Sequence, residues 1–185
     1  PLSVNNNLEM AINAFDGTTA KYLSGDTFGN TTNSVVSRDS GLLFRLSSAT
    51  APTKINFQSA ADTPAWNPTR FTLYGSKQPL TWSDDQWSLV GEGATGLTSG
   101  TAGNAWGGDV SLTSATAYTY YKVVFNQTAG GAGSPANYYA QIAEVKLTDT
   151  SGVISALPAT ASTTPTVVSN DGTVFSLTPD FAGTD

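Results

Sequence analysis

The sequence contains no histidine and no cysteine. Without histidine there is no imidazole for a Ser–His–Asp triad or a proton shuttle, and a zinc site of the usual His/Cys type cannot form. Without cysteine there is no thiol nucleophile, no iron–sulfur cluster and no disulfide framework. These two absences exclude several large classes of enzyme and metalloprotein before any sequence pattern is considered.

Charge is also scarce, because only 12% of the 185 residues are charged, and the formal net charge is −6. A nucleic-acid-binding surface needs clustered lysine and arginine, so we predict no nucleic-acid partner. The sequence has no run of about 18 apolar residues, so we predict no membrane insertion.

The acidic residues do not form a recognisable catalytic pattern. A glycosidase needs two carboxylates about 5–10 Å apart, one of them with a raised pKa. The candidates are Asp62, Asp84, Asp85, Glu92 and Asp109, and the adjacent pair Asp84–Asp85 is typical of a solvated turn. No residue is marked as a nucleophile by its neighbours. We therefore predict that the protein is not an enzyme.

The chain begins with Pro1–Val4 and three asparagines, without the basic and apolar regions of a secretion signal. Two explanations stay open. The chain is a trimmed or cloned part of a longer precursor, or its gene begins Met-Pro and the methionine was removed. We expect the protein to act outside the cell or on a virion surface.

Alternation of apolar and polar residues dominates the sequence, with Gly, Pro, Asn or Asp between the runs. Such runs are typical of β-strands, and their spacing favours an all-β sandwich or barrel. A helical pattern covers only Leu8–Phe15. Trp87 alternates with Leu89, which predicts that Trp87 lies in the core. The strand-like runs are 41–46, 54–58, 70–76, 86–90, 118–127 and 138–148.

Two segments between these runs are long and rich in glycine and alanine, namely Gly91–Gly108 and Ala129–Asn137. Loops of this length in a compact domain are usually functional or mobile. Their length therefore favours them as places to look for a binding site.

The composition changes from Ser151 onward. An aperiodic stretch over 156–165 contains two prolines and is typical of an extended linker. In 166–177 a Ser-Asn-Asp-Gly sequence separates two apolar runs, which predicts a β-hairpin. A lone hairpin is marginally stable, so it must pack on the main domain or on a neighbouring chain. We predict a sandwich over 1–150 and a linker-plus-hairpin tail over 151–185.

Three segments resemble the discoidin-type, galactose-binding-like β-sandwich family. Asn13–Leu23 resembles the family's opening A-h-D-G-x-x-x-x-h-h pattern, where h is apolar, and Asn67–Ser76 its D-P-x-x-F-x-L-x-G-S strand. Tyr118–Phe125 with Gln141–Leu147 resembles its closing strand pair. The family includes many bacterial carbohydrate-binding modules and the membrane-binding C domains of clotting factors. The resemblance implies an eight-stranded, jelly-roll-like antiparallel sandwich over about residues 10–148.

The resemblance also implies a calcium site in the first loop. Asp16 and Glu144 would each supply a carboxylate, and Asn13, Thr18 and Ala143 would supply backbone carbonyls, which are the oxygen ligands that calcium prefers. Relatives often have Asp-Gly-Asp in this loop, and here Thr18 replaces the second aspartate. Fewer charges predict weaker binding.

A structural role for the same acidic residues stays open. In that alternative Asp16 caps a turn, and Glu144 forms an ion pair with Lys21 or Lys146. No metal would then be needed at this loop.

Modules of this family bind ligands with loops at one end of the sandwich, and sugars present C–H faces that stack on aromatic rings. By position, Trp66, Trp106 and Tyr138 would stack on a sugar, while Arg70 and Asn104 would form hydrogen bonds with its hydroxyl groups. The alternative for each aromatic residue is packing over an edge of the sandwich.

Two functions follow from these observations. The first is a non-catalytic carbohydrate-binding or adhesion module that recognises surface glycans. The second is a structural protein of a bacterial virus, a capsid decoration, fibre or tail component, that uses the same fold for assembly or host attachment. The second rests on the Met-Pro alternative, the missing signal and cysteine, and the tail. In that case residues 151–185 would mediate a homo-oligomer or contacts with capsid or fibre proteins.

Overall fold

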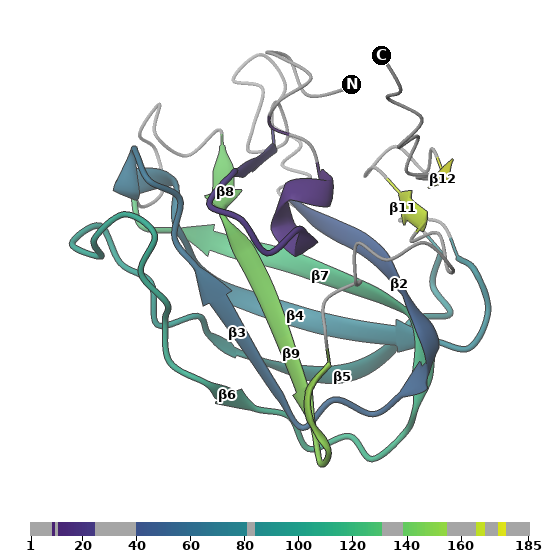
Figure 1. The fold of residues 1–185 in the computed structure, drawn as a ribbon. Helices are drawn as coiled ribbons and strands as arrows, with labels where there is room; N and C mark the ends of the chain where they lie inside the picture. The colour runs from purple at the N-terminus through teal and green to yellow at the C-terminus, as the bar shows by residue number, and fades with distance from the viewer. Residues whose placement is uncertain are drawn as a thin grey trace, which may run out of the picture.

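The computed structural model describes residue 9 and residues 11–24, 40–80, 84–130, 139–154, 166–168 and 174–176. Within these ranges the chain forms two larger antiparallel sheets that lie face to face, with a short two-stranded sheet at one end (Figure 1). This arrangement confirms the predicted all-β sandwich. No helix in these ranges has the length and apolar character needed to cross a bilayer.

The six-stranded sheet has the order β12-β11-β2-β7-β4-β5, and the four-stranded sheet has the order β10-β9-β3-β6. Strands β1 and β8 pair with each other. Two short 3-10 helices are η1 (Ala11–Phe15), which precedes β1, and η2 (Pro64–Trp66), which lies between β3 and β4. The strands are β1 (Tyr22–Ser24), β2 (Ser40–Thr50), β3 (Lys54–Gln58), β4 (Pro68–Ser76), β5 (Ser88–Ala94), β6 (Val110–Ser111), β7 (Tyr118–Thr128), β8 (Ala140–Ile142), β9 (Glu144–Asp149), β10 (Gly152–Ile154), β11 (Thr166–Val168) and β12 (Val174–Ser176).

The core lies between the two larger sheets and is built from alternate residues of their strands. Because successive side chains of a strand point to opposite faces, the residues that face the other sheet, such as Ile55 and Phe57 of β3, are apolar and buried. The Phe57 ring of β3 joins the sheets, since its centroid is 4.9 Å from that of Phe71 and 5.8 Å from that of Phe125. The outward residues of β3 and β9 are polar, and they form the outer face of the four-stranded sheet.

The predicted burial of Trp87 in the core is wrong. Trp87 precedes β5 and is half-buried, with the Lys122 ammonium 5.1 Å from its ring centroid, while Leu89 is 57% exposed. The strand register shifts between Leu73 and Tyr74, so Leu89 pairs with Tyr74 on the outer face and Val90 points inward. Val90 is the extra residue at this shift, and it moves the side chains before it to the other face of the sheet. Alternation of apolar and polar residues alone does not reveal such a shift.

The predicted helix corresponds to η1, a 3-10 helix that begins at Ala11, and Leu8 lies outside the described residues. The tail continues the sheets of the same chain: β10 pairs with β9, and the β11–β12 hairpin adjoins β2 through Val168 and Leu43 (Figure 1). One strand of the predicted hairpin, β11, is thus paired with β2 of the same chain. The predicted linker over 156–165 and the hairpin turn lie outside the described residues.

Candidate functional site

The first loop, Asp16–Ala20, is shaped by its own side chains. The Thr18 amide donates a hydrogen bond to Asp16 Oδ1 at 2.8 Å, and the Ala20 amide donates to Thr18 Oγ1 at 3.0 Å. Gly17 has a φ of +72°, a left-handed conformation in which glycine is favoured. The predicted capping of a turn by Asp16 is therefore confirmed.

Glu144 is the first residue of β9 and meets this loop from the outer face of the four-stranded sheet. Its side chain is buried, and its Oε1 accepts a second hydrogen bond from the Thr18 amide at 3.1 Å. The fold thus brings together Asp16, Thr18 and Glu144, which are far apart in the sequence. The remaining residues implied for a metal site lie on adjacent segments: Asn13 in η1, and Ala143 directly before Glu144.

The pKa of the Glu144 carboxyl is raised to about 7, first by burial and then by a hydrogen bond with the Asp16 side chain, against the opposing effect of the Gly17 and Thr18 amides. Two carboxyl groups close enough to share a hydrogen bond repel each other when both are ionised, and a bound cation would relieve that repulsion. The donor set therefore fits a hard cation such as calcium. No cluster of three or more Asp, Glu, His or Cys residues occurs in the described ranges, so backbone carbonyls would complete the shell.

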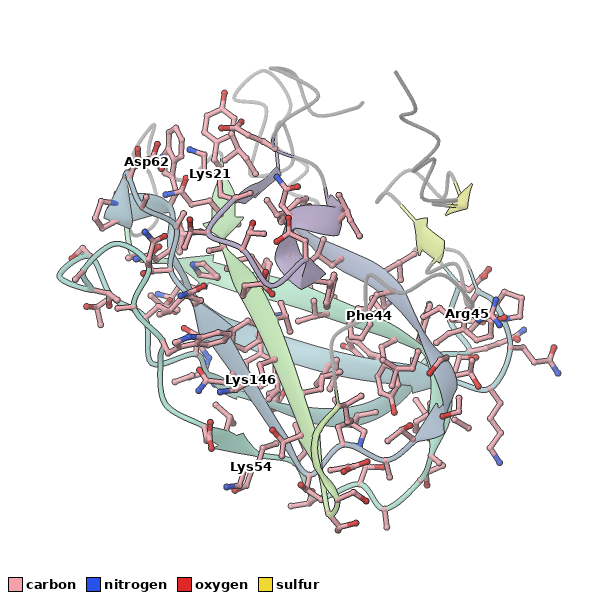
Figure 2. The ribbon with its side chains drawn as sticks, viewed as in Figure 1. Lys21, Phe44, Arg45, Lys54, Asp62 and Lys146 are labelled. Atoms are coloured by element: carbon pink, nitrogen blue, oxygen red, sulfur yellow. The ribbon has the colours of Figure 1, made fainter. Side chains whose placement is uncertain are left out.

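The predicted ion pair of Glu144 with Lys21 or Lys146 is not formed. Lys21 Nζ lies 2.9 Å from Asp62 Oδ1 and 3.3 Å from Glu9 Oε1. Figure 2 shows Lys21 and Asp62 close together at the end of the sandwich where β3 ends. Lys146 instead lies over the Trp106 ring, and the Glu144 carboxylate accepts a hydrogen bond from the Thr18 amide of the first loop.

A groove of about 370 Å³ opens beside the first loop, on the outer face of the four-stranded sheet. Its floor comes from the outward side chains at the start of β9 and the end of β3, where Gln58 pairs with Glu144. Its walls are the first loop on one side and Trp106 on the other. The residues with side chains that line this groove, called the Trp106 groove below, are Thr18, Thr19, Gln58, Trp106, Glu144, Val145 and Lys146.

Trp106 is the exposed aromatic residue of this groove. Its side chain is 42% exposed, and the Lys146 ammonium lies 4.6 Å from its ring centroid. Its backbone is fixed, because Trp106 forms an isolated bridge with Gln58, and the Gly107 amide donates to the Phe57 carbonyl at 2.8 Å. The loop over 95–108 is thus tied to the end of β3 on both sides of Trp106.

The two glycines that follow Trp106 have different roles. A Cβ on Gly107 would lie 2.2 Å from the Thr95 carbonyl oxygen, so only glycine allows the backbones to approach this closely. A Cβ on Gly108 would meet nothing within 4 Å. Gly107 therefore fixes the position of Trp106 by close packing.

The other residues predicted to contact a sugar lie elsewhere. Trp66 belongs to η2 and packs on Tyr139, with ring centroids 4.7 Å apart, and Tyr138 lies outside the described residues. Arg70 is exposed on β4, in the six-stranded sheet. Asn104 adjoins the groove indirectly, because its carbonyl accepts a hydrogen bond from Gln58 Nε2 at 2.9 Å.

Sequence reasoning missed Gln58, Thr19 and the place of Lys146 beside Trp106. The available signal was the alternation in Lys54–Gln58 and Glu144–Leu147, which predicts outward polar residues on both strands. Tertiary pairing makes β3 and β9 neighbours and brings the loop with Trp106 across the end of β3. Local alternation does not predict either of these contacts.

No protein-family model matches the sequence, and no curated protein matches it. Solved structures match its fold. The family 32 carbohydrate-binding module of Clostridium perfringens NanJ, solved in complex with galactose, is similar with a TM-score of 0.51 and 17% identity, over 77% of this chain and 86% of that chain. The family 32 module of Streptococcus pneumoniae EndoD is similar with a TM-score of 0.51 and 16% identity, over 80% and 90% of the two chains.

An F5/8 type C domain from Bacteroides fragilis is also similar, with a TM-score of 0.54 and 11% identity, over 76% of this chain and 81% of that chain. The chain therefore has the β-sandwich fold of the family 32 carbohydrate-binding modules and the discoidin-like domains. This confirms the fold expected from the three ordered motifs.

Proposed function

We propose that the protein is a non-catalytic carbohydrate-binding module that recognises surface glycans through the Trp106 groove. The observation that carries the proposal is Trp106 itself: a 42% exposed indole, on a backbone tied to β3, beside polar side chains of two neighbouring strands. An indole offers a flat apolar face for the C–H face of a sugar ring. The groove volume lies in the range of small-molecule sites.

The polar residues around Trp106 suit the hydroxyl groups of a sugar. Gln58 and Thr19 carry groups that donate and accept hydrogen bonds, and Lys146 donates only. Gln58 Nε2 already donates to the Asn104 carbonyl, which holds the amide in place. A site of this kind combines one stacking surface with a few placed polar groups, as ligand sites in proteins commonly do.

Glu144, the carboxylate of the groove, and Asp16 of the adjoining first loop favour binding over hydrolysis. A retaining glycosidase holds its two carboxyl groups about 5–5.5 Å apart, and an inverting enzyme holds them further apart, so that the scissile bond lies between them. Glu144 and Asp16 are close enough to share a hydrogen bond with each other, and Glu144 also accepts the Thr18 amide. No sugar bond fits between two groups in this arrangement.

We also propose that calcium binds between Asp16 and Glu144, with backbone carbonyls of Asn13, Thr18 and Ala143 as further ligands. The paired carboxyl groups and the buried position of Glu144 support this proposal. The ion would hold the first loop against β9. Because Thr18 and Thr19 form one wall of the Trp106 groove, the ion would stabilise the sugar site without touching the sugar.

The proposed function is tested by titrating the full chain with a glycan panel on an array, followed by calorimetry on the glycans retained. A hexose has about 12 non-hydrogen atoms, and about 0.3–0.5 kcal/mol for each predicts a dissociation constant of about 0.04–2 mM. We expect saturable binding that the free sugar competes away. Absence of binding to every glycan at millimolar concentration would contradict the proposal.

A further inference from the structure

We propose that the Trp106 groove selects sugars that carry a carboxylate, and that Lys146 is the residue that determines this preference. The inference rests on the proposed function, since it concerns the ligand of the same groove. The observation behind it is the placement of a lysine ammonium 4.6 Å from the centroid of the exposed Trp106 ring, inside the groove.

Lys146 differs from two other lysines of the described ranges in its partner. Lys21 lies 2.9 Å from the Asp62 carboxylate, and Lys54 lies 3.5 Å from the Asp109 carboxylate. The Lys146 ammonium contacts the Trp106 ring, and although its charge helps to lower the pKa of the Asp109 carboxyl, no described carboxylate lies within ion-pair distance of it. An aromatic face attracts a cation without neutralising its charge, so the ammonium stays available to an anion.

The acidic groups nearest to Lys146 are occupied by other partners. Asn56, which pairs with Lys146 across the two strands, donates a hydrogen bond from Nδ2 to Asp109 Oδ1 at 2.8 Å, and Lys54 lies on the other oxygen. Glu144 also lines the groove, but it is only 5% exposed and accepts the Thr18 amide under the first loop. Lys146 is therefore the more accessible charge of the groove, in a chain whose net charge is −6.

The geometry suits a carboxylated pyranose. The ammonium lies over one part of the indole, so a sugar ring that stacks on the exposed remainder places its edge substituents beside the ammonium. An equatorial carboxylate lies at that edge and is the substituent that an ammonium binds most strongly. A hydrogen bond between charged groups predicts about a tenfold preference for the acid over the matching neutral sugar. Uronic acids carry such an equatorial carboxylate, whereas α-linked sialic acids carry the same charged group in an axial position.

The test compares matched acidic and neutral ligands on the full chain by calorimetry. The pairs are an oligogalacturonate with its methyl ester, and sialyllactose with lactose, which distinguishes the two sources of the carboxylate. We expect about tenfold tighter binding of the acidic member of at least one pair. We also expect the preference to weaken as salt increases, because ions screen an exposed charge pair.

Three variants assign the preference to Lys146. Lys146→Met keeps an unbranched apolar side chain beside Trp106 and removes the charged donor, so it should lose the preference for acids and bind acidic and neutral sugars with equal affinity. Lys146→Arg should keep the preference. Lys54→Met, which removes a cation from the same sheet face outside the groove, should also keep it (Figure 2). Thermal unfolding of each variant checks that the fold is unchanged.

The outcomes separate the two proposals. Equal affinity for acidic and neutral sugars, or a preference that survives Lys146→Met, overturns the inference and leaves the proposed function standing. Absence of binding to any sugar, or sugar binding that is indifferent to Trp106→Ala, overturns both.

Discussion

Calcium is expected to raise the thermal unfolding midpoint of the protein by about 5–10 °C at pH 7.5, and the Glu144→Gln variant should not respond. A ligand at a hundredfold excess over its dissociation constant stabilises the folded state by about 2.7 kcal/mol, and about 2–4 °C per kcal/mol is typical for this chain length. Glu144 is the buried carboxylate of the proposed site, so its loss removes the charge that the ion needs.

The calcium-free protein should show a matching dependence on pH. The pKa of Glu144 is about 7 in the folded state and 4.5 for a solvated side chain, as in the unfolded chain. The folded state therefore binds more protons than the unfolded state between pH 4.5 and pH 7. The free energy of unfolding therefore falls as pH rises from about 4.5 to about 7, by up to about 3 kcal/mol, and this contribution is constant above pH 7. Calcium, which binds the ionised form, should offset the loss.

Glu92→Gln is the matched control, because Glu92 is an exposed glutamate on β5 in the other sheet. Differential scanning calorimetry of the wild type and both variants, with calcium and with a chelator, shows whether the calcium response depends on Glu144. Glu92→Gln should behave as the wild type does. Two results would contradict the proposed site. One is a calcium response that persists in Glu144→Gln. The other is a free energy of unfolding that rises between pH 4.5 and 7 in the calcium-free wild type, relative to Glu144→Gln.

Gly107→Ala is expected to destabilise the protein by about 1–3 kcal/mol and to weaken sugar binding, because it overpacks the contact that positions Trp106. The new Cβ would lie 2.2 Å from the Thr95 carbonyl oxygen, and neither backbone is free to move away. Thr95 is held by hydrogen bonds to Thr69 and Pro68, and Gly107 by its hydrogen bond to Phe57.

Gly108→Ala is the control for this prediction, since its Cβ would meet nothing within 4 Å. Urea unfolding gives the stability of both variants, and calorimetry gives their affinity for the best glycan. We expect Gly108→Ala to stay within about 0.5 kcal/mol of the wild type, as surface substitutions usually do. Equal effects of the two substitutions would show that the close approach of Gly107 does not position Trp106.

Local patterns predicted the longer strands, and the family resemblance implied the acidic pair. Alternation along Lys54–Gln58 and Arg70–Ser76 identified the apolar core residues of β3 and β4, because side chains alternate between the two faces of any strand. The resemblance of the first and last motifs implied that Asp16 and Glu144 meet, and the fold brings them together. Alternation failed at Trp87, where a register shift changes the face without changing the local pattern.

The groove was harder to predict because its two sides come from segments that meet only in the folded chain. Trp66 and Trp106 both lie in loops that precede a strand, and the sequence gives no reason to separate them. In the structure Trp66 packs on Tyr139, whereas Trp106 lies beside Lys146 on the four-stranded sheet. The sequence resemblance predicted the fold. The side chains that line the groove are brought together by strand pairing and by the close contact at Gly107, which the sequence does not show.

The most direct test of the Trp106 groove as the sugar site compares Trp106→Ala with Trp66→Ala by calorimetry on the tightest-binding glycan. Both variants remove an indole, but Trp66 packs on Tyr139 and does not line the groove. We predict that Trp106→Ala weakens binding at least about tenfold, because it removes the stacking surface, and that Trp66→Ala changes the affinity less than about twofold. Unchanged binding in Trp106→Ala, or loss of binding in Trp66→Ala alone, would contradict this account and place the sugar at the η2 loop instead.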